Sequence, residues 1–419
     1  MIEDLTHEFS LPPPDTGYRP WICLAACFLV EALVWGFPFS YGIFHDYYSS
    51  HEPFMSQPSG IAAIGTSAMG IMYFGCNFCF LGIRVLPWLK NKIALAGLCV
   101  MIVSLVASSF AESVQQLILT QGILYGIGGT LLYSPVIVYV DEWFVRRKGF
   151  AYGIMWAGTG FAGVTIPFIM DWGLNKYAWP TVLRGWAVVL FVLTGPLLAI
   201  IRPRIPPSQA QKPHRIDLSF LTNRTFLLCQ LGNVLEGLGF FAPAIYLPLY
   251  ARSMGLRNEA VTATVALLSI ATVFGCIFIG ILIDRFHVTT AILVSSIGAT
   301  VSIFLMWGFA ETHPLLCAFA VVYGFFAGSF TSTYTGIVKE VKKEHPSVDA
   351  GIIIGVLASG RGIGSIACGP LSEALLQNHP WEGELAFGYG SGYGALIVFT
   401  GVTAGLGGVS FVARRVGCI

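Results

Sequence analysis

The chain has 419 residues, of which 55% are hydrophobic and only 11% are charged, and its formal net charge is +1 at pH 7. Soluble domains carry roughly 25% charged residues, so these few charges could not cover the surface of a water-soluble protein of this length. The composition therefore indicates an integral membrane protein, and the near-neutral charge argues against a nucleic-acid partner.

The first twenty residues are acidic, polar and rich in proline. They lack the basic start and the apolar core of a cleavable signal peptide. We therefore expect residues 1–20 to form a disordered cytoplasmic tail, and the first membrane helix to serve as the insertion signal.

Apolar runs long enough to cross a bilayer follow this tail. A spanning helix needs about 20 apolar residues, and we place twelve such runs at 21–44, 60–82, 93–110, 115–139, 149–171, 183–201, 225–249, 260–283, 289–308, 314–337, 350–375 and 391–413. The longest polar break, 202–224, is rich in proline and basic residues. The sequence thus predicts an all-α membrane protein of twelve transmembrane helices, with a six-helix half at 21–201, a cytoplasmic linker at 202–224, a second half at 225–413 and a cytoplasmic tail at 414–419.

The basic residues predict the orientation of these spans. If the amino terminus is cytoplasmic, 18 of the 23 Lys and Arg residues fall on the inner side and four on the outer side. Cytoplasmic loops carry such an excess of Lys and Arg. We expect both termini inside and a multi-pass protein of the plasma membrane that works as a monomer.

The two predicted halves resemble each other. "LVEALVWGFPFSYGIF" (29–44) and "VLEGLGFFAPAIYLPLY" (234–250) align at an offset of 205, which places Glu31 on Glu236 and Pro38 on Pro243. Three further pairs of spans match at offsets of 198 to 202, including "YGIMWAGTGFAG" on "IGVLASGRGIGS". Two six-span units in the same orientation are typical of the parallel halves of a major facilitator transporter.

Longer motifs resemble one group within that superfamily. "DEWFVRRKGFAYGIMWAGTGFAG" (141–163) resembles the signature of monocarboxylate-porter-like transporters, and "WGFPFSYGIFHDYY" (35–48) resembles the first span of their fungal members. "GILIDRF" (280–286) resembles the superfamily's loop motif. The resemblance implies a transporter that moves a small organic solute by alternating access, with spans one, four, seven and ten around a central cavity and without a cofactor.

The sequence departs from the lactate-type members of this group. Phe39 stands where they carry a lysine, and Thr272 and Cys276 stand where they carry an Asp and an Arg. The resemblance therefore does not imply a lactate transporter, and a secondary metabolite remains an alternative substrate.

Three ionisable residues lie deep in the predicted spans: Glu31, Glu236 and Arg361. Each is about 11 residues from the cytoplasmic end of its span, which is ~16 Å at 1.5 Å per residue and close to the midplane. Charges at this depth are costly, so they face a cavity or each other. One hypothesis is that Arg361 attracts an organic anion while Glu31 or Glu236 takes and releases a proton; the alternative is a structural Arg361–Glu236 ion pair.

Other side chains are candidates for the pocket and for the gate. The predicted substrate-binding residues on the same spans are Trp35, Tyr41, Tyr133, Asn233, Phe240, Tyr246 and Tyr334. Pro38 and Pro243 are expected to bend their helices. The predicted cytoplasmic gate consists of charged clusters at Asp141, Arg146, Arg147, Asp284 and Arg285, with simple positive-inside anchoring as the alternative.

Two motifs suggest enzymes and are better explained by packing. "CNFC" (76–79) has no second pair of metal ligands, and "GTGFAG" (158–163) fits the dinucleotide fingerprint but lies within a membrane span rather than after a strand. The sequence therefore predicts no metal site and no enzymatic activity. The rival to a transporter is a non-transporting nutrient sensor of the same fold, although such proteins usually add a long cytoplasmic tail and we expect only "RRVGCI" here.

Overall fold

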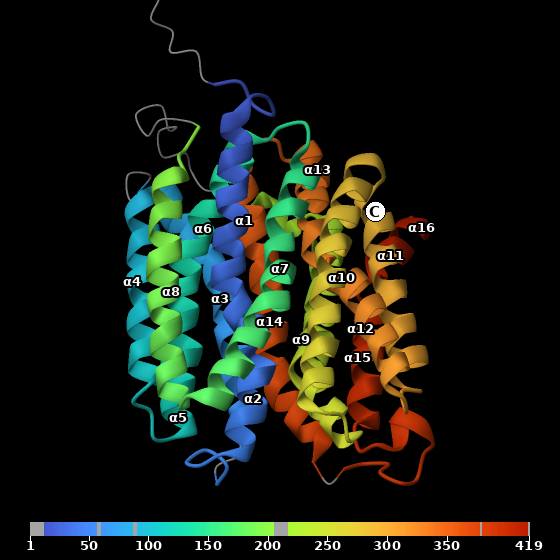
Figure 1. Cartoon of the computed structure of the whole chain (residues 1–419). Coiled ribbons are helices and arrows are strands. Elements are labelled where there is room, and N and C mark those ends of the chain that lie inside the picture. Colours follow the sequence, from blue (N-terminus) through green and yellow to red (C-terminus); the bar gives the residue numbers. More distant parts are fainter. Residues whose placement is uncertain (1–11, 57–59, 87–89, 205–216, 378, 418–419) are drawn as a thin grey trace, which may run out of the picture.

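The computed structural model describes residues 12–56, 60–86, 90–204, 217–377 and 379–417, and this part of the chain is built from helices without strands. The first six spans comprise α1 (Tyr18–Phe39) with α2 (Tyr41–Ser50); α3 (Ile61–Val85); α4 (Lys90–Ser108); α5 (Val114–Leu117), the π-helical η3 (Ile118–Leu124) and α6 (Tyr125–Trp143); α7 (Lys148–Lys176); and α8 (Trp179–Ile200). The helices pack side by side as one bundle (Figure 1).

The second six spans repeat this order after a short 3₁₀ turn, η4 (Ser219–Thr222). They comprise α9 (Arg224–Ser253); α10 (Asn258–Arg285); α11 (Val288–Val301) with the π-helical η5 (Ser302–Trp307); α12 (His313–Ala327), η6 (Phe330–Thr333) and α13 (Tyr334–Glu344); α14 (Ala350–Leu376); and, after η7 (Phe387–Gly390), α15 (Gly394–Leu406) with α16 (Val409–Arg415).

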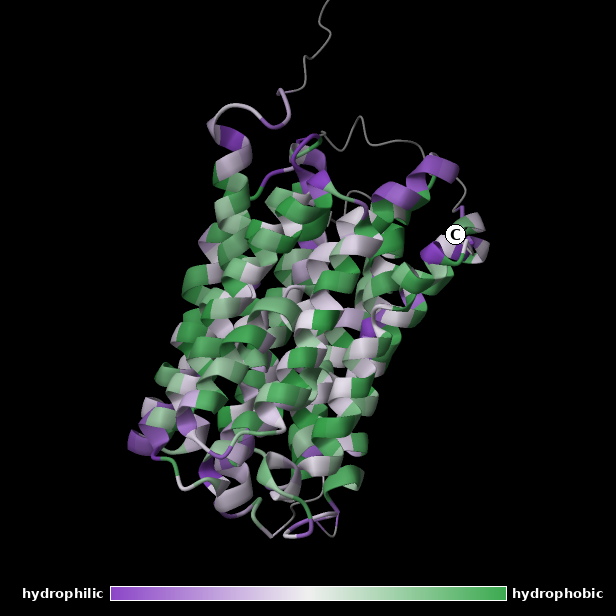
Figure 2. Cartoon of the chain, turned by 90° about the vertical axis from the view of Figure 1, so that its right-hand side faces the viewer, coloured by the Kyte–Doolittle hydropathy of each residue, from purple (hydrophilic) through white to green (hydrophobic). Residues whose placement is uncertain are grey.

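The predicted number of membrane helices is confirmed. Eleven helices of the described chain are long and apolar enough to cross a membrane, and the shorter apolar helix Lys92–Ser108 occupies the place of the third predicted span. Apolar residues fill the middle of the bundle, whereas polar residues gather at its two ends (Figure 2). A band of this kind is what the hydrocarbon core of a bilayer requires.

The most extensive contacts between the first six and the last six spans are those of α3 with α14 and of α7 with α10. Glycines let these helices approach closely. A Cβ atom at Gly280 of α10 would lie 2.6 Å from the backbone oxygen of Gly149 in α7, too close for any side chain. Small residues at such contacts are typical of helix packing in membranes. The division at 202–224 stays a prediction, because residues 205–216 of the linker lie outside the described residues.

The two matched prolines do not act alike. The first helix ends at Phe39, directly after Pro38, and the backbone N–H of Ser40 donates to the oxygen of Gly36. In contrast, α9 runs without interruption through Pro243. The break in the second half lies instead in span ten, where η6 separates α12 from α13. The helix is thus interrupted directly after Pro38 in span one, whereas α9 is continuous at Pro243 and the expected bend there stays a prediction.

Both described ends of the chain lie at the same end of the bundle (Figure 1), which we call the terminal end. The part of the predicted tail that is described is ordered: Asp15 accepts hydrogen bonds from the backbone N–H groups of Val145, Arg146 and Arg147 at 3.0 to 3.3 Å. Burial raises the pKa of Asp15, but these donors outweigh it and hold the pKa below its usual value. The expectation of disorder therefore fails for residues 12–20, and residues 1–11 lie outside the described residues.

Candidate functional site

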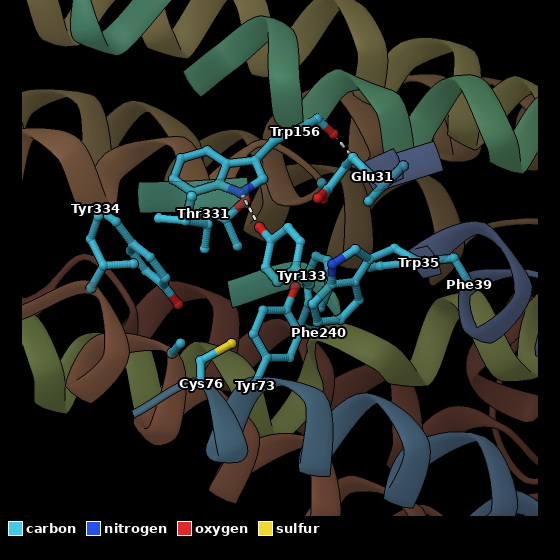
Figure 3. Close-up of a pocket in the computed structure, with 15 residues that line it drawn as sticks. Glu31, Trp35, Phe39, Tyr73, Cys76, Tyr133, Trp156, Phe240, Thr331 and Tyr334 are labelled. Atoms are coloured by element: carbon cyan, nitrogen blue, oxygen red, sulfur yellow. Dashed lines mark hydrogen bonds between the residues drawn. The ribbon is translucent and has the colours of Figure 1, made fainter. Parts of the chain in front are cut away.

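A cavity with a buried carboxyl group lies in the middle of the bundle, where the two sets of six spans meet (Figure 3). It lies between α1, α3, α6, α7, α9, η6, α13 and α14. We call it the acidic lobe, and its lining residues are Glu31, Trp35, Phe39, Tyr73, Cys76, Tyr133, Ile137, Trp156, Thr159, Phe240, Gly328, Thr331, Tyr334, Ile354 and Ala358.

Glu31 is the only acidic residue in this lining, and its side chain is 1% exposed. Tyr133 faces the carboxyl group and interacts with it (Figure 3). The second carboxyl oxygen, Oε2, is buried without a hydrogen-bond partner among the described residues. An unpaired carboxylate in such surroundings is strongly disfavoured, so Glu31 is more stable there as the neutral acid.

Glycine on α7 brings Glu31 to this place. A Cβ atom at Gly158 would lie 2.5 Å from the backbone oxygen of Phe28 and 3.0 Å from the Cβ of Glu31. The close approach of α1 and α7 thus needs a glycine here. This confirms the packing interpretation of "GTGFAG", which lies within the helix α7.

Aromatic side chains form the rest of the wall. The Trp156 indole N–H donates to the Tyr133 hydroxyl at 2.6 Å. Trp35 packs on Tyr73 and Tyr133, with ring centroids 4.4 and 5.3 Å apart. The indole nitrogen of Trp35 is buried without a partner among the described residues. The polar groups without a partner in this wall therefore include the carboxyl of Glu31 and the N–H of Trp35.

The other predicted acidic residue has a cationic partner. Arg361 Nη1 lies 2.5 Å from Glu236 Oε2, and the two side chains are 0% and 5% exposed. The Arg361 guanidinium also lies over the Phe240 ring at 4.0 Å and near Tyr73 at 5.9 Å. Neither charged residue of this pair lines the acidic lobe. The alternative interpretation of the sequence, a Glu236–Arg361 ion pair between α9 and α14, is thus present in the structure.

A second cavity adjoins the first. Because apolar residues predominate in its lining, we call it the apolar lobe. Its lining residues are Phe39, Thr159, Gly160, Phe240, Ala244, Leu247, Val265, Leu268, Ser269, Thr272, Tyr323, Gly324 and Gly328. Phe39 and Thr272, two of the positions at which the chain departs from lactate-type porters, lie in this wall.

Of the predicted substrate-binding residues, Trp35, Tyr133, Phe240 and Tyr334 line the acidic lobe. Three others lie away from both lobes, with their polar groups or rings in contact with protein. The Tyr41 hydroxyl donates to the oxygen of Ile61 at 2.5 Å, Asn233 donates to Leu357 and accepts from Tyr334, and Tyr246 packs against His45. Arg361 likewise lies behind the wall rather than in it.

The structure adds Tyr73, Cys76, Thr159 and Thr331 to the predicted lining. Cys76 belongs to the "CNFC" motif, which was assigned to packing alone. Tyr73 and Cys76 lie in span two, which the sequence did not place among the spans around the cavity. Thr331 could not be recognised, because nothing in the sequence predicted the short turn η6 within span ten.

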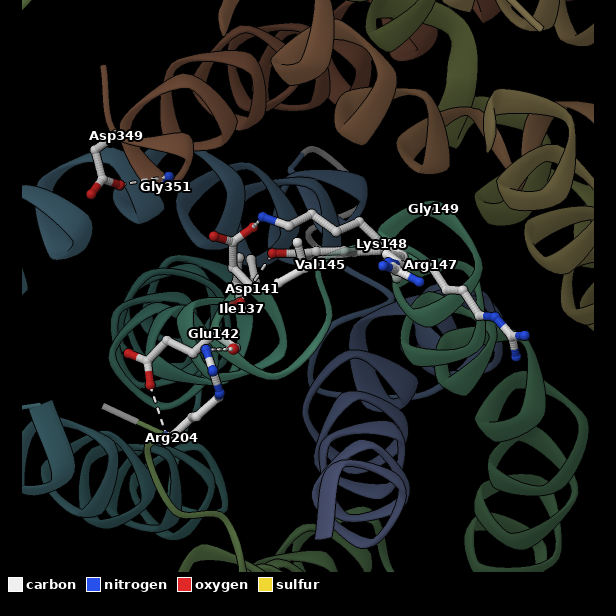
Figure 4. Close-up of polar contacts among 12 residues, drawn as sticks. Ile137, Asp141, Glu142, Val145, Arg147, Lys148, Gly149, Arg204, Asp349 and Gly351 are labelled. Carbon is white, nitrogen blue, oxygen red and sulfur yellow. Dashed lines mark hydrogen bonds and ion pairs between the residues drawn. The ribbon is translucent and has the colours of Figure 1, made fainter. Parts of the chain in front are cut away.

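The predicted gate is only partly formed (Figure 4). Lys148 pairs with Asp141 at 2.6 Å, and the backbone N–H of Arg204 donates to Glu142 at 3.0 Å. The side chains of Arg146 and Arg147 form no ion pair with any described residue. Their backbone N–H groups bind Asp15, and the role of both residues in a gate stays a prediction.

Asp284 also differs from the expectation of an Asp284–Arg285 cluster. Its carboxylate accepts hydrogen bonds from the backbone N–H groups of Gly149 at 3.2 Å and Phe150 at 3.1 Å, at the first turn of α7. The unpaired N–H groups and the dipole of a helix N-terminus favour such a charge. Arg285 takes no part, so the contact between the two sets of spans is a carboxylate on a helix end.

The opposite end of the bundle has a contact that the sequence did not predict. Arg252 of α9 pairs with Asp46 of α2 at 2.6 Å, and their side chains are 39% and 18% exposed. With Asp284 at the terminal end and this pair at the far end, the two sets of spans are joined above and below the central cavity.

A membrane bundle of two joined six-helix sets around a central, largely enclosed cavity defines the class of protein: a polytopic transporter fold. Comparison with known proteins agrees, since the model of the Major Facilitator Superfamily matches residues 62–365. The chain belongs to this superfamily, and its relatives are named as transporters, so it is not an enzyme.

Similar proteins include several fungal transporters. The chain is 27% identical to the MFS transporter asaE of Aspergillus flavus over 97% of this chain and 89% of that protein. It is 27% identical to the agnestins efflux protein AgnL12 of Paecilomyces divaricatus, over 96% and 89% of the two chains. The solved structure of the human organic anion transporter MFSD10 has the same fold, with a TM-score of 0.63, 13% identity and coverage of 96% and 99%.

Proposed function

We propose that this protein is a secondary active transporter that exports a small organic solute by alternating access, and that Glu31 carries the coupled proton. The observation that carries the proposal is the contrast between an unpaired carboxyl group in the wall of the central cavity and its repeat-related counterpart, which has a cation at 2.5 Å. A carboxyl group that is neutral when enclosed and ionised when hydrated binds and releases one proton in each cycle.

Efflux is supported by the relatives. Proteins similar over most of the chain are named for the efflux of agnestins and of aspyridones. An organic metabolite exported across the plasma membrane, with both termini in the cytoplasm, is the corresponding proposal for this chain. The resemblance to monocarboxylate porters supplies the alternative of a monocarboxylate-like anion, which would require Arg361 to leave Glu236 and pass the Phe240 ring.

The first experiment identifies the solute. Cells that express the protein are compared with cells that lack it, by untargeted measurement of metabolites in the medium and in the cell. We expect at least one organic solute to move from the cell to the medium when the protein is present. Equal profiles under all growth conditions would support a non-transporting sensor instead.

The second experiment tests the proton. Uptake of the identified solute into sealed inverted vesicles is measured with and without a pH gradient. We expect Glu31→Gln to abolish the stimulation by the gradient while facilitated exchange persists. The variant Glu259→Gln, at the exposed first turn of α10, is the control and should respond to the gradient as the wild type does. Full gradient-driven accumulation by Glu31→Gln would contradict the proton role.

A further inference from the structure

The acidic and apolar lobes share part of their walls, so we treat them as one elongated binding space. Four residues belong to the walls of both: Phe39, Thr159, Phe240 and Gly328. Because the same residues bound the two lobes, a ligand longer than the acidic lobe would pass along them into the apolar lobe. The shape of this space therefore restricts the solute beyond the general proposal made above.

The free polar groups of the acidic lobe suit a neutral head group. Glu31 Oε2 and Trp35 Nε1 are buried without partners among the described residues. In contrast, the Tyr334 hydroxyl already donates to Asn233 and the Tyr133 hydroxyl already accepts from Trp156. A hydroxyl or amide group both donates and accepts hydrogen bonds, so one such group would satisfy both free atoms.

The charges around the cavity disfavour an anionic head. Among the described residues, no Lys, Arg or His side chain lines either lobe. The guanidinium of Arg361 lies behind Phe240 and is already paired with Glu236. A carboxylate in the acidic lobe would therefore meet Glu31 without a counter-charge, at a high cost in a water-poor site.

The apolar lobe offers almost no hydrogen-bond donors to a ligand. Its hydroxyl groups donate to backbone oxygens of the protein: Thr159 to Trp156, Ser269 to Val265, Thr272 to Leu268 and Gly324, and Tyr323 to Phe240. The remaining wall consists of the apolar side chains of residues such as Leu247, Val265 and Leu268. An apolar body gains free energy there in proportion to the surface it removes from water.

We infer that the solute is a neutral, elongated amphiphile: a hydroxyl- or amide-bearing head lies against Glu31 and Trp35, and an apolar body lies between Phe39, Leu247 and Leu268. This inference rests on the proposed function and names its substrate class. It also makes Val265 and Leu268 residues that determine specificity for the length of the apolar body.

The test measures the binding of a series of esters to the purified protein in detergent by calorimetry. The probes are the methyl, butyl and octyl esters of 4-hydroxybenzoic acid, with the free acid anion as the charged member. We expect affinity to rise by up to about fourfold per added methylene until the lobe is full, and the anion to bind at least tenfold more weakly than the methyl ester.

Variants of α10 distinguish binding of the ester in the apolar lobe from its partition into the detergent micelle. Val265→Phe fills the apolar lobe, so we expect it to remove the gain from butyl to octyl and to change methyl-ester binding less than about twofold. Ile270→Phe, on the same helix and 39% exposed, should keep the full series. Leu268→Ala offers a second variant, in which octyl binding falls severalfold and methyl binding does not.

The inference would be overturned if affinity rose equally with ester length in the wild type, Val265→Phe and Leu268→Ala. The alkyl group of the ester would then lie outside the apolar lobe. Tighter binding of the anion than of the methyl ester would overturn the neutral head. The binding series does not depend on flux: the expected pattern in a protein that transports nothing would support the inference and refute the proposed function.

Discussion

Glu31 and Glu236 occupy the same place in the two halves of the repeat, yet their surroundings differ. Both are almost fully buried, at 1% and 4% exposure. Glu236 has Arg361 at 2.5 Å, whereas Glu31 has a phenol and an empty space. The position that corresponds to Arg361 in the first half is Thr159, because Gly158 and Gly160 align with Gly360 and Gly362. One residue on the partner helix thus separates the two environments.

The same position in the two halves of the repeat can therefore have two different roles. A carboxylate paired inside the protein ties two helices together, and its removal leaves an uncompensated buried charge. A carboxyl group without a cation is held neutral by burial and can exchange a proton when water reaches it. The second half therefore supplies a contact between α9 and α14, and in the proposed function the first half supplies the group that faces the solute.

The largest expected effect comes from breaking the paired site. Arg361→Met leaves Glu236 buried without its cation, which should reduce the free energy of unfolding by about 3–5 kcal/mol. Thermal unfolding followed by size-exclusion chromatography measures this. The double variant Arg361→Met with Glu236→Leu should recover most of the loss, and Arg257→Met, which removes an exposed arginine, should change little. A loss below about 1 kcal/mol for Arg361→Met would show that the pair does not hold the helices.

The next effect comes from giving Glu31 the cation that it lacks. Thr159 lines the acidic lobe together with Glu31, so Thr159→Arg places a guanidinium in the same lobe and is designed to convert the site into a copy of the paired one. We expect gradient-driven transport to fall at least tenfold, because the carboxylate would no longer take up a proton, while the protein stays folded.

The control for this conversion is the double variant Thr159→Arg with Glu31→Gln. If the new arginine acts through Glu31, the double variant leaves a buried, unpaired cation and unfolds at a lower temperature than Thr159→Arg alone. Equal stability of the two variants, together with unchanged transport by Thr159→Arg, would contradict the role assigned to residue 159.

Much of this comparison could be predicted from the sequence, because an internal repeat aligns residues without any structure. Apolar runs of about 20 residues located the twelve helices, and the cost of charge in hydrocarbon indicated that Glu31, Glu236 and Arg361 face inward. Periodicity reports that a side chain is buried but not what it is buried against. The sequence therefore could not distinguish Trp35, which lines the cavity, from Tyr41, which bonds to the backbone of α3.

The gate was harder to predict for a related reason. Asp284 contacts backbone N–H groups of α7. Every residue except proline has such a group, so the sequence does not indicate which of them will bind a carboxylate. Arg146 and Arg147 were predicted to act through their charged side chains, whereas the structure shows contacts of their backbone N–H groups with Asp15. The pair of Asp46 and Arg252 required knowledge of how the far ends of spans one and seven meet.

A smaller effect is expected at those far ends, where the same two spans are joined by Asp46 and Arg252. A partly exposed ion pair contributes up to about 1 kcal/mol, so Asp46→Asn should increase opening by at most about fivefold. Cys76, which lines the acidic lobe and is 1% exposed, reports opening through its rate of reaction with a thiol reagent, and Cys76→Ser supplies the background. The exchanged pair Asp46→Arg with Arg252→Asp should restore the wild-type rate of thiol reaction. If Asp46→Arg and Arg252→Asp each accelerated the reaction and the exchanged pair did not recover, a specific ion pair would be excluded.

The smallest effect concerns a third carboxylate, Asp15, which is stabilised mainly by backbone N–H groups at the terminal end, with a smaller contribution from the charge of Arg146. The pKa of Asp15 lies below its ordinary value of 3.8, so its contribution is present above pH 3.8 and is lost as the pH falls through the lower folded value. Asp15→Asn should therefore raise hydrogen exchange at Val145, Arg146 and Arg147 about two- to fivefold at pH 5, as the loss of a helix cap of up to about 1 kcal/mol would. The ratio between variant and wild type should approach one near pH 2, where both lack the charge. A ratio that stayed constant across this range would mean that the tail is held by its shape rather than by the ionised carboxyl group, and the contrast among the three carboxylates would then reduce to the two inside the membrane.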